Sequence, residues 1–352
     1  MAVGHDGLLE AIDDPSQYSI SRVAQSSLPI FIPWHREQKH ITCGFQSVNL
    51  TSPDGPWKDA SPFLESAVYQ SKCQTKLENG AARDVEGHSA SNSITSEHLS
   101  GSLGVSVGNA VVEVGVTASY DQQMQELTNA SRASHSSGFR CGRIILVEDP
   151  PFSNDAKTLL QREDGDKLFA ERYGDYFVSG YVLGADSGGC LAASASSKRT
   201  VETLTTEVNV KVLWISYTSS TSTTDIRQTC SMDLTFYGYD TLNGTNLSKQ
   251  AQAGKSTQEI QLAAQGCIDN SNNLQLRLKR RMSELGIEDE GTMSVAKCSK
   301  AVEGGVVVEL ILTPFRTLKE YIHCIYEGKR KRAIQATLEG DEAGQMERKT
   351  GR

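Results

Sequence analysis

The segment GVSVG at residues 104–108 has the residue types and spacing of a hydrolase nucleophile. In that motif the serine occupies a sharp turn between a strand and a helix, which exposes its hydroxyl to a substrate carbonyl. Here the chain continues as NAVVEV over residues 109–114, which predicts a continuing strand and not a helix. We therefore interpret Ser106 as a small residue on a sheet face. A hydrolase that uses Ser106 is the last of three functional hypotheses.

The segment GKST at residues 254–257 is similar to the end of a phosphate-binding loop. That motif requires another glycine five residues before the first glycine of GKST, and position 249 is a lysine. No predicted strand leads directly into the segment. We interpret it as a polar loop that opens a helix.

Cysteine and histidine, the usual ligands of zinc, show no ligand spacing in this chain. The eight cysteines form no CxxC pair, and the seven histidines form no HExxH motif. We therefore expect no metal, no cofactor and no catalytic residue. The cysteines are expected to be free and mostly buried, although their even number leaves disulfides open. They are Cys43, Cys73, Cys141, Cys190, Cys230, Cys267, Cys298 and Cys324.

Composition and charge exclude several classes of protein. Hydrophobic residues make up 38% of the 352 residues, which is enough for a core, and the net charge is −8. An acidic chain lacks the concentrated basic face of a nucleic-acid binder, so we expect no nucleic-acid partner. No run of 18 apolar residues predicts a membrane-spanning helix. Residues 1–14 lack the basic and long apolar regions of a signal peptide.

The first half of the chain predicts mostly extended structure. Prolines at both ends of the run at residues 28–33 favour an edge strand or an arm. The other elements expected here are a loop at 52–62, a polar segment of weak pattern at 76–102, a strand pattern with one bulge or bend at 103–120, a polar segment at 121–137 that could form a short helix, and a strand at 139–147.

The second half predicts helices and strands with clearer boundaries. Ser153 can cap a helix that is broken near Gly165 and resumes to about Arg172. A strand follows at once and closes in a glycine cluster. The remaining elements are a hairpin that pairs 208–217 with 226–237 around a Ser/Thr-rich tip, helices at 255–287, a strand at 306–312 and a helix at 316–326.

The order of these elements resembles the membrane attack complex/perforin (MACPF) domain. In that family a helix leads into an aromatic-Gly-Thr/Ser-His-aromatic signature, which opens a long strand. Tyr173, Gly174 and Phe177 match this signature, whereas Asp175 replaces the Thr/Ser and Tyr176 replaces the His.

Two further segments complete the resemblance, which covers roughly residues 65–328. Gly184, Gly188 and Gly189 resemble the family's glycine bend after the signature strand, and residues 308–318 resemble its closing strand and helix. The resemblance therefore rests on the ordered set and on no single motif.

The resemblance implies an α+β fold, in which a strongly bent four-stranded antiparallel sheet is flanked by two helical clusters. It divides the chain into an N-terminal arm with loops (1–64), a MACPF-like domain (65–328) and a charged C-terminal tail (329–352). In pore-forming members the two helical clusters unfurl into amphipathic hairpins, and many protomers form a ring. Because lipid cannot satisfy open sheet edges, such strands cross a bilayer only when the ring is closed.

The two candidate hairpins are unequal as membrane-spanning segments, which need about 9–11 residues per strand with one apolar face. The first, over 115–143, is polar on both faces, and a carboxylate facing lipid is costly. The second, over 206–235, keeps one apolar face, although any half-buried antiparallel strand alternates in this way. The candidate membrane residues are Val112, Val114, Val116, Ala118 and Tyr120 in the first hairpin, and Val208, Val210, Val212, Trp214, Ile226, Cys230, Met232 and Leu234 in the second.

The leading functional hypothesis is a perforin-like, pore-forming toxin or immune effector that oligomerises into a ring and inserts β-hairpins. The alternative is a non-lytic, soluble interaction module with the same fold. The partners expected are other copies of the chain and a membrane lipid surface, reached directly or through a separate lipid-binding protein. The localisation stays open between cytoplasmic and unconventionally released, followed by membrane association. The basic run at 329–332 could bind acidic headgroups, act as a nuclear signal or be a solvated helix face.

Overall fold

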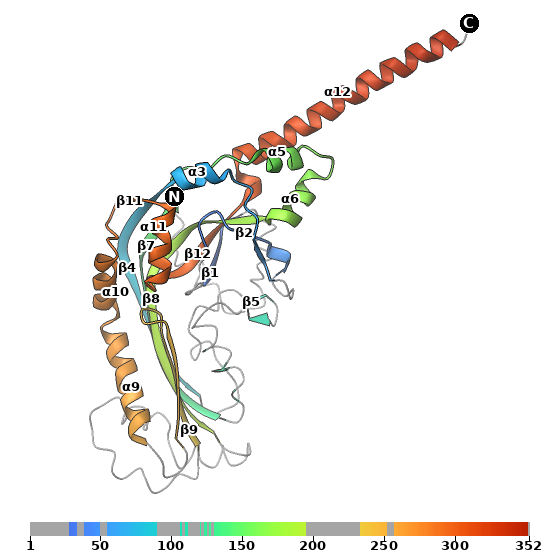
Figure 1. Ribbon diagram of the computed structural model, residues 1–352. Coiled ribbons are helices and arrows are strands. Elements are labelled where there is room, and N and C mark those ends of the chain that lie inside the picture. The colour runs from blue at the N-terminus through green and yellow to red at the C-terminus, as the bar shows by residue number, and fades with distance from the viewer. Residues whose placement is uncertain are drawn as a thin grey trace.

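The computed structural model describes residues 28–33, 39–49, 55–89, 106–107, 110–111, 120, 123–124, 127, 130–194, 233–251 and 257–350. The described residues form a large antiparallel sheet with helices grouped beside it (Figure 1). The predicted α+β class is therefore confirmed.

Three long strands form the centre of the sheet: β4 (Lys72–Ser89), β7 (Ala130–Leu146) and β8 (Tyr176–Ser194). They pair antiparallel along their length and curve strongly together (Figure 1). Two segments share the fourth position: β12 (Val307–Pro314) pairs with the first part of β8, and β9 (Asp233–Asp240) pairs with its last part. A bent four-stranded sheet is thus present, with its fourth strand supplied in two pieces.

Shorter strands extend the sheet at its margins. β1 (Ile30–Pro33) pairs with β12, which agrees with the predicted edge strand. The other additions are β2 (Gly44–Phe45) beside β8 and β3 (Trp57–Lys58), β10 (Thr245–Ala251) beside β9, and β11 (Thr292–Ser294) beside β4.

One group of helices packs at the end of the sheet where β8 begins. It contains α3 (Glu65–Gln70), α5 (Asn154–Leu160) and α6 (Gly165–Tyr173), together with the short 3-10 helices η2 (Ser47–Asn49) and η5 (Phe315–Thr317). As predicted, the Ser153 side chain accepts a hydrogen bond from the Ala156 amide and caps α5. An aromatic core of Phe63, Phe152, Phe169, Phe177 and Phe315 joins this group to the sheet.

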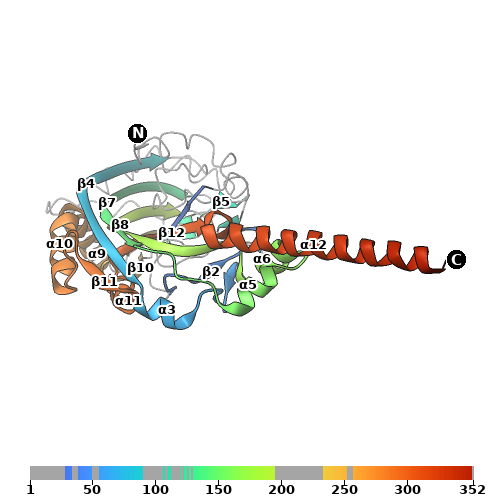
Figure 2. The ribbon, with the colours of Figure 1, turned by 90° about the horizontal axis from the view of Figure 1, so that it is seen from above.

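The second group of helices covers one face of the curved strands (Figures 1 and 2). It contains α9 (Thr257–Asn272), α10 (Leu274–Glu284) and α11 (Val295–Glu303). Leu274, Leu278 and Met282 of α10 are buried in the largest hydrophobic core, against Tyr181 and Leu183 of β8. The last helix, α12 (Lys319–Thr350), continues the chain without a break across residue 328.

Three segments have elements that differ from, or add to, the local expectations. Residues 76–89 belong to β4, although they are polar, because an edge strand is held by its backbone pairing with β7 and needs no apolar face. The segment at 121–137 is not one helix: Gln123 and Met124 are helical, but β7 begins at Ala130. In the segment at 103–120 the bend and not the bulge is present, because β5 (Ser106–Val107) pairs back on β6 (Ala110–Val111), and Tyr120 is helical.

Candidate functional site

The MACPF-like signature forms the joint between α6 and β8. The helix ends at Tyr173, and Gly174 has φ 92°, a conformation that a residue with a Cβ rarely adopts. A Cβ on Gly174 would also lie 2.4 Å from the Phe45 carbonyl oxygen. The glycine of the signature is thus required by the backbone, which turns sharply here to enter the sheet.

Asp175 connects three segments at this joint. Its carboxylate accepts hydrogen bonds from the Ser47 amide (2.7 Å) and the Ser47 hydroxyl, while its backbone binds Phe45 and Phe315. The residue that departs from the family pattern therefore anchors η2 to the start of β8.

The aromatic residues of the signature are packing residues. The Phe177 ring stacks on Phe315 with centroids 5.0 Å apart, and the Tyr173 ring lies 5.0 Å from that of Phe169. Tyr176 is buried, its hydroxyl donates to the Leu28 carbonyl (3.3 Å), and burial, aided by the Asp175 charge, raises its pKa to about 12. A phenol held neutral in this way binds structure together and takes no part in proton transfer near neutral pH.

The glycine cluster does not close the strand, and this prediction was wrong. β8 runs through Gly184, Gly188 and Gly189 to Ser194. These glycines lie where the outer neighbour of β8 changes from β12 to β9, since Leu183 pairs with Val307 and Ser187 pairs with Asp240. A Cβ on Gly184 would lie 2.3 Å from the Phe139 carbonyl oxygen, so the cluster allows strands to approach closely inside the curved sheet.

A partly buried ion-pair network lies at the same level of the sheet. Arg140 of β7 contacts Asp186 of β8 (2.6 Å) and Glu309 of β12 (3.0 Å). Burial alone would lower the pKa of Arg140, but the two adjacent carboxylates outweigh burial and raise it. Arg140 therefore stays charged, and its two contacts tie β7, β8 and β12 together at the point where β8 changes partners.

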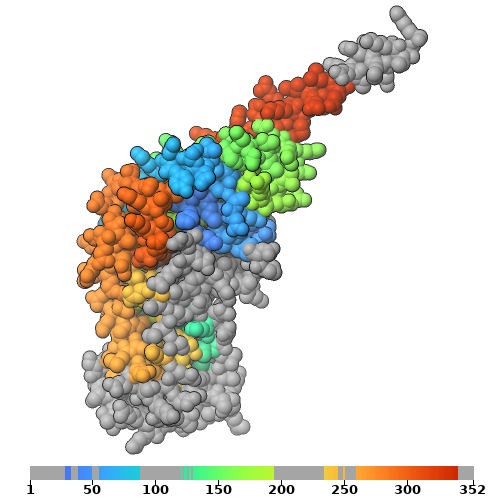
Figure 3. Space-filling view, in the orientation of Figure 1, coloured from blue at the N-terminus to red at the C-terminus, as the bar shows by residue number. Residues whose placement is uncertain are grey.

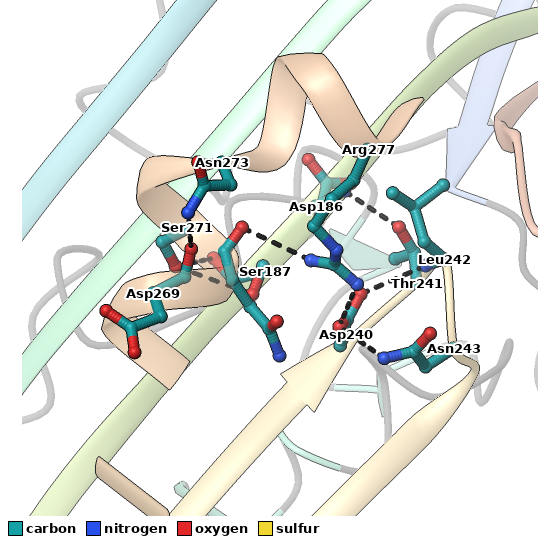
Figure 4. A network of polar contacts seen from close by, with 11 residues as sticks. Asp186, Ser187, Asp240, Thr241, Leu242, Asn243, Asp269, Ser271, Asn273 and Arg277 are labelled. Atoms are coloured by element: carbon teal, nitrogen blue, oxygen red, sulfur yellow. Dashed lines mark hydrogen bonds and ion pairs between the residues drawn. The ribbon is translucent and has the colours of Figure 1, made fainter. Parts of the chain in front are cut away.

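A second part of this network attaches the helices to the sheet (Figure 4). Arg277 of α10 pairs with Asp240 at the end of β9 (2.5 Å), and Asp240 also accepts from the Asn243 amide (3.0 Å). The Thr241 hydroxyl accepts from the Asp186 amide (2.8 Å), which links this part to the Arg140 cluster. Helix α10, the β9–β10 turn and β8 are thus held by one continuous set of polar contacts.

At the end of the sheet opposite the signature, β4 and β8 end beside the residues at which β7 and β9 begin. Ser89 of β4 lies opposite Arg132 of β7, Ala130 of β7 lies opposite Ser194 of β8, and Ser194 lies opposite Asp233 of β9. Residues 90–129 therefore join two neighbouring antiparallel strands, and residues 195–232 join the next two. Both connections leave the sheet from the same end of its strands.

A small cluster fastens the first connection to the sheet. Tyr120 and Met124 are buried with Cys190 and Tyr239, and the Tyr120 and Tyr239 ring centroids are 4.7 Å apart. Arg132, which is fully buried, donates to the Leu127 and Ala130 carbonyl oxygens, and burial lowers its pKa. Part of the first connection is thus packed against β8 and β9 in this conformation.

Solved structures similar to this chain have low identity and low TM-scores. A MAC/perforin-domain protein from Bacteroides thetaiotaomicron is 11% identical with a TM-score of 0.25, over 63% of this chain and 54% of that one. The cytotoxin suilysin from Streptococcus suis is 10% identical with a TM-score of 0.31, over 81% of this chain and 60% of that one. GNIP1Aa from Chromobacterium piscinae is 13% identical with a TM-score of 0.27, over 88% and 57%.

These likenesses decide neither the family nor the function, because all three TM-scores lie well below 0.5. The matched region spans 54–60% of the length of those proteins. No protein-family model matches the chain. No curated protein matches it either.

Most of the candidate membrane residues lie outside the described part of the chain. In the first hairpin this holds for Val112, Val114, Val116 and Ala118, and in the second for all residues before Leu234. Of the two that are described, Tyr120 is 2% exposed and Leu234 is 7% exposed. Both side chains are packed inside the protein in this conformation.

The described residues include Ser106 and several buried thiols. Ser106 lies in β5, a two-residue strand paired with β6, and not on a strand–turn–helix elbow. Burial raises the pKa of Cys141 to about 11 and those of Cys190 and Cys267 to about 12, which keeps these thiols protonated at neutral pH. No group of His, Cys, Asp and Glu among the described residues could hold a metal ion. No described helix is long and apolar enough to cross a membrane.

Sequence analysis missed the ion-pair network of Arg140, Asp186, Glu309, Asp240 and Arg277. A signal was present, because Arg140, Asp186 and Glu309 each interrupt a strand of apolar or small residues. A charge at such a position needs a buried partner of opposite sign. The identity of the partner depends on strand order, which the sequence alone does not supply.

Proposed function

We propose that this chain is a perforin-like, pore-forming or membrane-perturbing protein, whose copies join side by side in a ring. In this proposal residues 90–129 and 195–232 leave their resting positions and extend the sheet as two β-hairpins that insert into a bilayer. The chain carries out no catalytic step.

The observation that carries the proposal is that β4, β7, β8 and β9 all have a terminus at the same end of the sheet. Each connection joins neighbouring antiparallel strands, so pairing can continue from the strand ends into the connection without any change of topology. A strand of about 9–11 residues crosses the hydrocarbon core, and each connection is long enough to supply two such strands.

The margins of the sheet suit side-by-side assembly. Among the described strands, only β11 pairs with the outer side of β4, and it does so only at Lys72–Gln74. Most of β4 is therefore an open edge, which is a template for pairing with another chain. At the opposite margin β10 covers β9. Contact between two different edges is heterologous and generates a ring when the rotation closes.

Dye release from liposomes tests the proposal. The wild-type chain, alone or with a lipid-binding partner from cell extract, is expected to release dye and to form rings visible by negative-stain electron microscopy. The decisive variant replaces residues 93–126 by a short Gly/Ser turn, because Ser89 and Arg132 lie opposite each other and a short turn can join them. This variant is expected to form rings without releasing dye.

A matched variant separates the hairpin from general damage. A Gly/Ser segment of the same length as residues 93–126 keeps the connection long but removes its side chains, and it should also form rings without release. A wild-type chain that stays monomeric and releases no dye over a broad lipid panel contradicts the proposal. That result favours the alternative, a non-lytic interaction module.

A further inference from the structure

Among the described residues, helix α12 contacts the body of the protein along its first part. Ile325 packs against the aromatic core, Lys331 donates to the Gln161 side chain (2.8 Å), and Arg332 donates to the Gln161 carbonyl oxygen. Beyond this point the helix projects away from the body (Figures 1 and 3). A single helix in water is marginally stable, and Gly340 and Gly344 lower its propensity further.

The side of α12 that faces away from the body carries large apolar residues. Ile322, Tyr326, Ile334 and Leu338 are 56%, 64%, 52% and 58% exposed. They follow one another at intervals of four or eight residues, so they form a stripe that winds by about 160° around the helix, in which Ile334 and Leu338 are direct neighbours. An exposed apolar stripe of this kind marks an interaction surface.

The middle of α12 carries two blocks of opposite charge. Residues 329–332 are all basic, and the sequence places Glu339, Asp341 and Glu342 within the following ten residues. Ile334 and Leu338 lie between the two blocks. The midpoint between the two blocks lies near residues 335 and 336. When a second copy of the helix lies antiparallel and the two midpoints coincide, each basic block lies beside the acidic block of the other copy. A parallel copy brings blocks of like charge together, which is unfavourable.

We propose that two copies of this chain associate through antiparallel pairing of their α12 helices, with Ile334 and Leu338 of both copies at the centre. In this pair Arg330 of each copy lies beside the acidic block of the other. The contact is isologous and closes at two copies. A membrane of anionic lipid is a poorer occupant of this surface, because the acidic block next to Leu338 would be repelled by it.

The pair is independent of the ring, which uses the edges of the sheet. Its test is sedimentation velocity of the full chain without lipid, over a concentration series at about 0.05 M and about 0.5 M salt. We expect a monomer–dimer equilibrium with a dissociation constant that rises with salt. Leu338→Glu is expected to raise this constant at least about tenfold, whereas Leu276→Glu, at an equally exposed leucine of α10, should leave it unchanged.

Charge reversal tests the antiparallel register. Reversing Lys329 and Arg330 to Glu should abolish the dimer, and reversing Glu339, Asp341 and Glu342 to Lys should abolish it as well. The chain with both sets reversed should regain the dimer, because the attraction is restored with its signs exchanged. No single change to the body of the protein gives this pattern of loss and recovery.

Three results overturn the proposal. The first is a wild-type chain that remains monomeric at about 0.1 mM in low salt. The second is a dimer that Leu338→Glu leaves unchanged. The third is a monomer that binds anionic vesicles in flotation and loses this binding in Leu338→Glu, which assigns the stripe to a lipid surface.

Discussion

Asp175 occupies a position where the MACPF signature has Thr or Ser, and its contacts show what this departure does. The carboxylate accepts from both the amide and the hydroxyl of Ser47. A hydrogen bond to a charged acceptor is stronger than one to a neutral acceptor. At the residue scale Asp175 therefore fastens η2 to the start of β8.

Removal of this carboxylate is expected to weaken the joint. Asp175→Ala leaves the partly buried Ser47 amide without its acceptor, so we expect the free energy of unfolding to fall by about 1–3 kcal/mol. Urea denaturation measures the change. Glu163→Ala, at an exposed carboxylate of the turn between α5 and α6, is the control and should have little effect. A loss no larger than that of the control would show that the Ser47 contacts add nothing.

Removal of Arg140 is expected to cost more. Arg140→Met leaves the Asp186 and Glu309 carboxylates without their partner, and because the cluster is only partly buried we expect a loss of at most about 3–5 kcal/mol, the cost of breaking a buried pair. The triple variant with Asp186→Asn and Glu309→Gln removes the stranded charges and should recover part of that loss. Denaturant unfolding of both variants gives the comparison. A triple variant less stable than Arg140→Met contradicts the interpretation of a charge-balanced cluster.

At the scale of elements, sequence signals predicted the ends of helices and strands well where the residues that set the end are neighbours in the chain. Ser153 caps α5 as expected, Gly174 ends α6, and β12 runs into Pro314. No element was predicted for the later part of β4, because the polar residues after Leu77 are held in a strand by pairing with β7, which begins far along the chain at Ala130. The prediction failed at the glycine cluster, where the exchange of β12 for β9 depends on strand order.

The β9–β10 pair is the element whose movement the proposed ring requires, because β10 covers the edge of β9. Thr235 and Gln250 lie opposite each other, at a Cα separation suited to a disulfide. A chain with both residues changed to Cys is expected to release dye only after reduction with dithiothreitol. A lock at the other margin, Phe31→Cys with Ile311→Cys, should not inhibit release. Full activity of the oxidised β9–β10 lock would mean that the outer edge of β10 is used instead.

At the scale of the whole molecule, buried phenol and thiol groups make the free energy of unfolding depend on pH in the alkaline range. Burial raises the pKa of Tyr176 from 10.0 to about 12, and those of Cys190 and Cys267 from 9.0 to about 12. Between these values the unfolded chain has lost protons that the native state still holds. The unfolded state then binds fewer protons, so the free energy of unfolding falls as pH rises from about 9 to about 12.

Each such group contributes a slope of at most about 1.4 kcal/mol per pH unit. Denaturant unfolding at a series of pH values should therefore show stability that is nearly level below pH 9 and falls increasingly steeply above it. Cys267→Ala removes one titrating thiol and should make the decline shallower between about pH 9 and 12, although the smaller side chain lowers stability at every pH. Tyr326→Phe, at an exposed ring of α12, is the matched control. An unchanged slope in Cys267→Ala would show that this thiol titrates alike in the folded and unfolded chains, and so that α9 does not shield it from water.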